Sequence, residues 1–372
     1  MKERTKKTLK WVFIAAGSLI FLIISTIIIA FFLIHNSIYE PVSFVERESS
    51  YVMPDFPESD VIPIEDESFL PDDESEDEIS FDESIPDTSG SSDKSGTPGG
   101  SGGSGGTYVP KETPIYIVEP IDENILNILL VGRDVFDSLG GRSDSMMLLS
   151  YNKKTGEIIL TSFLRDSLVP IEGHGWNRLN TTYRFGNVGL TINTINEIFQ
   201  LDIQHYVSVD YSGFIELINR IGGVSVYISQ EEANYLNEKY NWDISKGEHH
   251  LNGSRALIFS RIRKLSGGDF NRTERQRRLL SAVIKKITET YSAGETVPIL
   301  YDALKQVKTN LPRSSIISLI YGFMAKDTLS IGTGAVPASG TYSLVRYNGM
   351  SVIRLDFQKN IDIIHERIYG KE

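Results

Sequence analysis

Three absences in the 372-residue sequence restrict what the protein can be. Cysteine is absent, which excludes disulfides, thiolate nucleophiles and Cys-ligated metal sites. Lys and Arg are absent from residues 55–93, although this stretch holds 16 Asp and Glu. Charge of either sign is absent from residues 11–34. Taking the 16 acidic charges out of the net charge of −12 leaves +4, so the acidic balance belongs to one stretch and not to the rest of the chain.

The uncharged run at 11–34 predicts a transmembrane helix. At about 1.5 Å rise per residue, a run of this length crosses a hydrocarbon core of roughly 30 Å. Basic residues crowd positions 1–10 and acidic residues follow the run, so the positive-inside rule predicts a cytoplasmic tail at 1–10 and residues 36–372 outside. A cleaved signal peptide is the competing interpretation, but its apolar region would be only about 7 to 15 residues long. We therefore predict a single-pass, type II protein of the cell membrane.

The composition of residues 35–120 predicts a disordered extracytoplasmic linker. Pro and acidic residues dominate first, and SGSSDKSGTPGGSGGSGG follows at 89–106. Such a composition cannot bury enough apolar surface to offset the entropy of ordering. The acidic run could instead bind calcium or a basic partner, but it lacks an ordered Gly-containing loop at ligand spacing. We interpret it as a solvated spacer.

The remainder, 121–372, predicts one folded domain of the α/β (α+β) class. The apolar run at 126–131 is typical of a strand buried on both faces, and 145–151 and 157–163 flank a turn, NKKTG, as in a hairpin. Other strands are expected at 205–209, 224–228, 342–347 and 351–356, and helices at 188–200, 214–221, 271–291, 296–308, 313–324 and 357–369. This mixture predicts a central mixed β-sheet flanked by helices on both faces.

Charged residues gather where predicted strands begin or end. The segments are VGRD at 131–134, GRSDSMML at 141–148, TSFLRDS at 161–167, and SRIRK at 260–264 followed by GGDFNRTERQRR at 267–278. In the first two, Asp134 and Asp144 offer the hard oxygen ligands that magnesium takes together with substrate phosphates. In the third, Arg165 and Asp166 end the hairpin. Guanidinium groups match phosphate oxygens in bidentate fashion.

The last pair of segments adds further arginines at regular spacing. In an extended stretch, Arg261 and Arg263 would point to the same face. On the helix that follows, Arg272, Arg275 and Gln276 lie close enough to share a face. A metal ion with several arginines neutralises the charge that builds up in phosphoryl transfer. The residue types therefore predict a pyrophosphate-handling site.

Other interpretations of these charges stay open. The Arg and Asp side chains could pair with one another as structural salt bridges, although about six Arg outnumber the nearby carboxylates. The basic stretch at 255–278 could bind nucleic acid, but its predicted place outside the cell argues against such a partner. His249 and His250 are adjacent, so they do not face one ligand from a regular element, and a solvated loop is expected there.

In this order, the motifs resemble the LytR-CpsA-Psr family of cell-wall glycopolymer transferases over roughly residues 124–290. The matching segments are NILLVGRD, GRSDSMML, SFLRD, RLNTTYRFG, YVSVDYSGF with IGGV, LNGSRALIFSRIRK, and DFNRTERQRR. The resemblance implies a type II membrane enzyme of a Gram-positive envelope. It would move a glycopolymer (wall teichoic acid, capsule or another secondary polymer) from a polyprenyl pyrophosphate carrier to peptidoglycan, leaving a phosphodiester. It also implies a magnesium ion and a hydrophobic tunnel for the lipid tail.

Residue by residue, the resemblance implies that Asp134 and Asp144 hold the metal and act in catalysis together with Arg165. The implied pyrophosphate-binding set is Arg142, Arg165, Arg178, Arg261, Arg263, Asp269, Arg272, Arg275 and Gln276. The chain departs from the family pattern at three places: Phe136 stands where members often carry Arg, Leu164 replaces the usual Pro, and Gly186-Asn187 replaces a Gly-Gly pair. No departure removes a metal ligand.

Alternative functions use the same residues differently. With water in place of a sugar acceptor, the site would hydrolyse the pyrophosphate of a lipid-linked glycan. A non-enzymatic envelope protein that binds polyanions would need the arginines but not Asp134 and Asp144. A DNA-binding transcriptional attenuator conflicts with the predicted topology.

Overall fold

The computed structural model describes residues 35–36, 38–64, 112–133, 143–290, 307–312, 314–316, 319, 322 and 330–370. The predicted membrane span at 11–34 and the Gly/Ser-rich run at 89–106 lie outside these residues. Within the described ranges, no helix combines the length and the apolar character needed to cross a bilayer.

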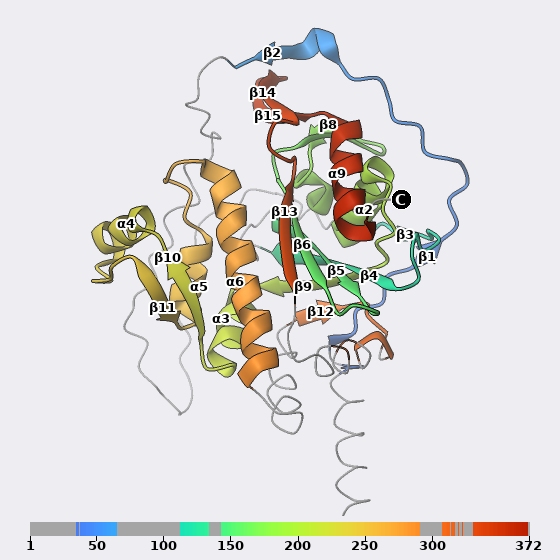
Figure 1. The fold of residues 1–372 in the computed structure, drawn as a ribbon. Coiled ribbons are helices and arrows are strands. Elements are labelled where there is room, and N and C mark those ends of the chain that lie inside the picture. The colour runs from blue at the N-terminus through green and yellow to red at the C-terminus, as the bar shows by residue number, and fades with distance from the viewer. Residues whose placement is uncertain are drawn as a thin grey trace, which may run out of the picture.

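A six-stranded mixed sheet forms the centre of the fold (Figure 1). Its strands are β4 (Ile125–Arg133), β5 (Ser143–Asn152), β6 (Ile158–Phe163), β9 (His205–Asp210), β12 (Val307–Thr309) and β13 (Ile331–Val336), in the order β12-β9-β4-β5-β6-β13. β9 runs parallel to β4 and β13 parallel to β6, whereas the other neighbours are antiparallel. The predicted hairpin is confirmed, because β5 and β6 pair from Tyr151↔Ile158 onward.

Helices cover both faces of this sheet, as predicted (Figure 1). Helices α2 (Thr181–Phe199) and α9 (Phe357–Tyr369) pack on one face and α6 (Gly268–Thr290) on the other. Side chains alternate between the two faces along each strand. In β4, Leu129 therefore enters the core shared with α2 and α9, while Ile128 enters the core shared with α6.

A smaller lobe packs beside α6 around its own apolar core (Figure 1). It comprises α3 (Tyr211–Arg220), the hairpin of β10 (Val224–Ile228) and β11 (Gly247–Leu251), α4 (Gln230–Tyr240) and α5 (Gly253–Ser260). The prediction of a solvated loop at the histidine pair was wrong. His249 and His250 lie in β11, because β10 alternates buried and exposed residues and pairs through its backbone with this polar segment.

Short strands complete the fold. Strands β2 (Val61–Pro63), β14 (Tyr342–Tyr347) and β15 (Met350–Leu355) form a sheet, β7 (Leu168–Ile171) pairs with β8 (Gly175–Arg178), β1 (Phe44–Val45) pairs with β3 (Ile115–Tyr116), and the 3-10 turn η1 (Glu58–Asp60) precedes β2. Most of the helix expected at 296–308 lies outside the described residues, but its last two positions belong to β12, where the β-branched Val307 and Thr309 pair with β9. The described residues within 313–324 are helical.

The prediction that all of 35–120 is a disordered linker does not hold for its described parts. Ile38 is only 1% exposed, and Tyr39 forms a bridge with Thr309. Farther along, β1 pairs with β3 and β2 pairs with β14. Composition averaged over a long segment conceals short apolar groups, and each of these short strands gains its hydrogen bonds from a partner strand of the fold.

Candidate functional site

Six charged side chains from three parts of the chain form an arginine–aspartate cluster, defined as Arg165, Asp166, Arg178, Arg263, Asp269 and Arg272. Within the first turns of α6, Arg272 Nη2 lies 2.7 Å from Asp269 Oδ1. The same oxygen lies 3.7 Å from Arg165 Nε and 4.0 Å from Arg263 Nε. With four cations and two carboxylates, the cluster carries two positive charges in excess.

Asp166 connects the second half of the cluster. Its Oδ2 lies 3.6 Å from Arg165 Nε and its Oδ1 lies 3.4 Å from Arg178 Nε, at the end of β8. The backbone here is fixed from two sides, because the Asp166 carbonyl accepts the Ile353 N–H at 2.9 Å and the Arg165 carbonyl accepts the Asn180 N–H at 3.1 Å. Both residues are also buried, with Arg165 3% and Asp166 1% exposed.

The two aspartates respond differently to this environment. Burial raises the pKa of Asp166 above its ordinary value of 3.8, and the attraction of Arg165 does not cancel that rise. Burial acts in the same direction on Asp269, but the charges of Arg272, Arg165 and Arg263 outweigh it and hold the pKa of Asp269 below its ordinary value. Asp269 is thus the firmly ionised counterion of the arginines, and Asp166 is the carboxyl that takes up a proton more readily.

Gln276 links α6 to the start of β5. Its Oε1 accepts a hydrogen bond from Ser145 Oγ at 3.0 Å. The register of the sheet pairs Arg133 with Ser143, so the end of β4 and the start of β5 lie side by side. The motifs VGRD, GRSDSMML and DFNRTERQRR, which are far apart in the sequence, therefore meet beside one helix.

The predicted metal ligands cannot be placed in this geometry. Asp134, Arg142 and the side chain of Asp144 lie outside the described residues, so their roles stay predictions. Among the described side chains, no three of His, Cys, Asp or Glu come together as a metal site would require. The donor chemistry fits magnesium, which takes few carboxylates and keeps several waters. Both Asp166 oxygens are buried without a hydrogen-bond donor, so the site has spare acceptors for such waters.

Arg261 and Arg263 do not share a face, contrary to prediction. Helix α5 runs to Ser260, and Arg261 still has a helical backbone, with φ −102° and ψ −1°. The guanidinium of Arg261 lies 4.6 Å from the ring centroid of Tyr211, whereas Arg263 reaches Asp269. The segment was predicted as extended, but Arg261 is the C-cap of α5 and Arg263 follows in an irregular stretch, so the alternation of a strand does not apply to the pair.

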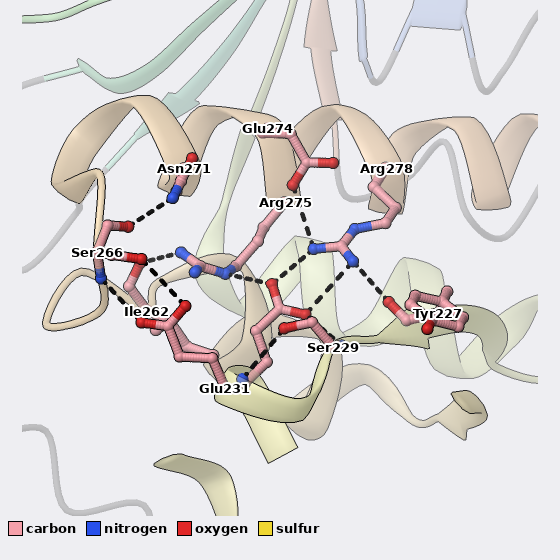
Figure 2. A network of polar contacts seen from close by, with 10 residues as sticks. Tyr227, Ser229, Glu231, Ile262, Ser266, Asn271, Glu274, Arg275 and Arg278 are labelled. Atoms are coloured by element: carbon pink, nitrogen blue, oxygen red, sulfur yellow. Dashed lines mark hydrogen bonds and ion pairs between the residues drawn. The ribbon is translucent and has the colours of Figure 1, made fainter. Parts of the chain in front are cut away.

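Arg275 lies outside the cluster, in a separate network that joins α4 to α6 (Figure 2). Its Nε donates to Glu232 Oε1 at 2.7 Å and its Nη1 donates to the Ile262 carbonyl at 3.0 Å. Arg278 Nη2 donates to the same Glu232 oxygen at 2.7 Å. Arg275 is 3% exposed. The structural salt-bridge interpretation therefore applies to this arginine, because the buried Glu232 carboxylate holds its guanidinium.

Asp166 is a site residue whose role the sequence pattern did not predict. Its position next to Arg165 suggested only a local pair. The contact with Arg178 exists because the β7–β8 hairpin folds back beside the turn after β6. Adjacency to an arginine after a buried strand was the one signal in the sequence, and it does not reveal which groups approach from elsewhere.

The LytR_cpsA_psr family model matches residues 109–366, which is more than half of the chain. The chain belongs to the LytR_cpsA_psr family. Two further family motifs, the arginine pair of SRIRK and the acidic start of DFNRTERQRR, meet in the cluster through Arg263 and Asp269.

Two sequences and one solved structure illustrate what this family member is similar to. The polyisoprenyl-teichoic acid–peptidoglycan teichoic acid transferase TagU of Oceanobacillus iheyensis is 36% identical over 212 residues, which cover 54% of this chain and 64% of TagU. Biofilm regulatory protein A of Streptococcus mutans is 32% identical over 251 residues, covering 60% and 61%. The chain thus spans less than two thirds of the length of these relatives.

The solved structure is that of Bacillus subtilis YwtF (TagT) with bound octaprenyl pyrophosphate lipid. It matches with a TM-score of 0.53 and 22% identity, over 68% of this chain and 93% of that one. This likeness confirms the fold, a mixed sheet with helices.

Proposed function

We propose that the chain is a phosphotransferase that moves a glycopolymer from a polyprenyl pyrophosphate carrier to peptidoglycan and leaves a phosphodiester link. The observation that carries the proposal is the cluster's excess of positive charge: four arginines surround two aspartates at the meeting point of the family's motifs. Guanidinium groups in excess of carboxylates suit a dianionic or more highly charged pyrophosphate. The names of TagU and TagT support the class of donor and acceptor.

In the proposed reaction, Arg165 and Arg272 hold the pyrophosphate oxygens, with Arg178 and Arg263 on either side. A hydroxyl of peptidoglycan, by family analogy the C6 hydroxyl of N-acetylmuramic acid, attacks the phosphorus attached to the glycan. The bond from that phosphorus to the bridging oxygen breaks, and polyprenyl phosphate leaves. The hydroxyl proton passes to a carboxylate, Asp134 or Asp144. Positioning and charge neutralisation supply most of the rate enhancement in such transfers.

We infer that Mg²⁺ binds Asp134 and Asp144 and, when bound, offsets charge on the pyrophosphate oxygens. Asp269 keeps Arg272 and Arg165 aimed at the same place, because it pairs with both. The type II topology is part of the proposal and is supported by the uncharged run at 11–34 after a basic tail. A C-terminal reporter that reads cytoplasmic would contradict this topology.

The test combines the full-length protein in detergent with Mg²⁺, a lipid-linked glycan pyrophosphate and peptidoglycan oligomers. Polyprenyl phosphate and a glycan–peptidoglycan phosphodiester should both form, and Arg165→Ala should lower their rate by about 100-fold or more, because a buried phosphate-binding charge is lost. Arg220→Ala is the matched control, since Arg220 is exposed on α3 and pairs with Glu216.

Other outcomes identify the alternatives. Polyprenyl phosphate together with free phosphorylated glycan would point to the hydrolase. Tight binding of the donor without any turnover would point to a non-enzymatic polyanion-binding protein. Full transfer activity of Asp144→Ala would contradict the proposed role of Asp144 as a metal ligand.

A further inference from the structure

A cavity of about 630 Å³ lies along α6, between this helix, the β10–β11 hairpin and the edge strand β13. Its wall includes four cations of α6, namely Arg277, Arg278, Lys285 and Lys286. Residue 277 comes five positions after the cluster residue Arg272. At about 3.6 residues per turn, this spacing places the two roughly 140° apart around the helix axis. The cavity is therefore a second site, on the other side of α6 from the arginine–aspartate cluster.

Arg277 is the buried cation of this cavity. It is 9% exposed, and its Nε and Nη1 are buried without a hydrogen-bond partner. The nearest turn of α6 carries Glu274, but that carboxylate pairs with Arg278 at 3.2 Å. Burial lowers the pKa of Arg277, and the charge of Arg367 lowers it further, although Glu274 partly offsets both effects. A buried guanidinium with unused donors is costly to the fold, so its presence calls for a ligand.

A second guanidinium approaches Arg277 from α9. Arg367 Nη1 is also buried without a hydrogen-bond partner. It lies against the backbone of Gly334, where an added Cβ would come within 2.1 Å of Nη1. The preceding residue, Thr333, lines the cavity. Arg367 is not among the residues that line the cavity, but its positive charge acts on Arg277, and an anion bound at the Arg277 guanidinium would offset that repulsion.

The positive charge continues along the helix. Lys285 is eight residues beyond Arg277, which at 1.5 Å per residue is about 12 Å farther along the axis. Lys285 is exposed and Lys286 is half-buried. The lining carboxylates are Glu248 and Glu274, and the second is already paired. The cationic groups thus extend over a longer distance than one phosphate group covers.

We propose that this cavity binds consecutive phosphodiester groups of an extended anionic polymer, with Arg277 as the buried anchor and Lys285 and Lys286 contacting later groups. The guanidinium fork matches phosphate oxygens, and lysines act on them as point charges. A phospholipid headgroup shares this chemistry but presents a single phosphate, whereas the cations are spread along α6. That the polymer is the transferred glycopolymer rests on the proposed function; binding of a phosphodiester chain does not.

The test titrates the full-length protein in detergent with a defined glycerol phosphate oligomer, without magnesium or lipid-linked donor, and measures affinity by calorimetry. Arg277→Gln should weaken binding roughly tenfold or more, as loss of one charge-assisted contact would. The double variant Lys285→Gln/Lys286→Gln should also weaken it, and this change on the open side of the helix tests the site even if Arg277→Gln misfolds. The exposed control Arg220→Gln should bind like the wild type.

Three outcomes would overturn the proposal. One is loss of oligomer binding in Arg272→Gln but not in Arg277→Gln, which would assign the polymer to the cluster. Another is binding to phosphatidylglycerol vesicles with no binding of the oligomer. The third concerns Arg277→Met, whose Tm without ligand should equal or exceed that of the wild type, because no hydrogen bond is lost. A Tm several degrees lower would show that Arg277 is structural.

Experiment can contradict the proposed function without contradicting this inference, and the reverse. Oligomer binding that depends on Arg277, in a protein that does not transfer glycan, would leave the inference standing. Transfer without any such binding would leave only the proposed function.

Discussion

Asp269 carries the charge that holds three guanidinium groups together at the start of α6, while Asp166 faces two arginines from the turn after β6. At the helix N-terminus, the backbone dipole also favours the Asp269 carboxylate. The two acids are linked through Arg165, which pairs with both. Their roles nevertheless differ, because the neighbouring arginines lower the pKa of Asp269 in spite of its burial, whereas burial raises the pKa of Asp166.

Stability should therefore depend on pH with opposite signs in two variants. The lowered pKa of Asp269 means that its stabilisation is present above the ordinary value of 3.8 and is lost as pH falls below it. The raised pKa of Asp166 means that the folded chain keeps a proton that the unfolded chain releases, so stability falls as pH rises above 3.8. The loss of stability caused by Asp269→Asn should become smaller in acid. The stability of Asp166→Asn relative to the wild type should instead increase as pH rises. Urea unfolding between roughly pH 3 and 7 checks this, and equal slopes for the two variants would contradict it.

At the scale of elements, α6 presents three contact surfaces besides the wall of the cavity. One carries the cluster, one packs on the sheet, and one meets α4 through Glu232, Arg275 and Arg278. Glu232 also caps α4, because its Oε2 accepts the Ser229 N–H at 2.8 Å and its own N–H donates to Ser229 Oγ. One carboxylate thus fixes both the start of α4 and its docking on α6.

Arg275→Met should lower the free energy of unfolding by about 3 kcal/mol, because it leaves the buried Glu232 carboxylate with one cation fewer. Its KM for the lipid-linked donor should stay unchanged in the folded protein, whereas Arg272→Met should lose transfer. Urea unfolding and donor kinetics on both variants distinguish the two roles. A raised KM with unchanged stability in Arg275→Met would show that Arg275 binds the pyrophosphate, as the resemblance implied.

How far the sequence predicts each element depends on where its stabilising contacts come from. The β5–β6 hairpin was predictable because its turn and both apolar strands are local. Helix α2 consists of two helical pieces that join across Gly186 and Asn187, which leave the helical conformation (Asn187 at φ 60°). The predicted helix from 188 corresponds to the second piece, and the first piece, from Thr181, was not predicted. Helix α4 is polar and was not predicted; its capping box and its salt bridges to α6 stabilise it.

In the candidate site, too, contacts between residues near in sequence were predictable and contacts between distant segments were not. Helical spacing put Arg272 and Gln276 near each other, and Asp269 is one turn from Arg272. The approach of Arg165 and Arg178 depends on the packing of β6, β8 and α6, which no local pattern encodes. The capture of Arg275 by Glu232 from another helix was equally invisible in the sequence.

On the scale of the whole molecule, the described N-terminal segment belongs to the fold. Ile38 is fully buried, Glu40 N–H donates to the Thr309 carbonyl at 2.8 Å, and Arg47 pairs with Glu197 of α2. The segment contacts the β12 edge, the α2 side and the β14 sheet in turn. It therefore passes along one side of the domain before residue 64 (Figure 1).

Ile38→Ala should lower the free energy of unfolding by about 2 to 5 kcal/mol, as expected for a fully buried aliphatic side chain. Val52→Ala is the matched control, since Val52 is 79% exposed, and should change stability by less than about 0.5 kcal/mol. Urea unfolding of the full-length protein in detergent measures both. Equal effects of the two substitutions would mean that residues 38–64 do not pack on the domain in solution.

Both ends of the interval 65–111 are thus pinned, because Ile64 N–H bonds the Leu344 carbonyl at 3.1 Å and Thr113 N–H bonds the Gly186 carbonyl at 3.2 Å. For an interval whose two ends are held in this way, removing 89–106 would alter the entropy of closure by only about 0.4 kcal/mol. His35, directly after the predicted span, contacts the Leu311 carbonyl at 3.1 Å. If residues 11–34 span a bilayer, as proposed, the height of the domain above the membrane is set at His35, because the chain joins the fold at this residue.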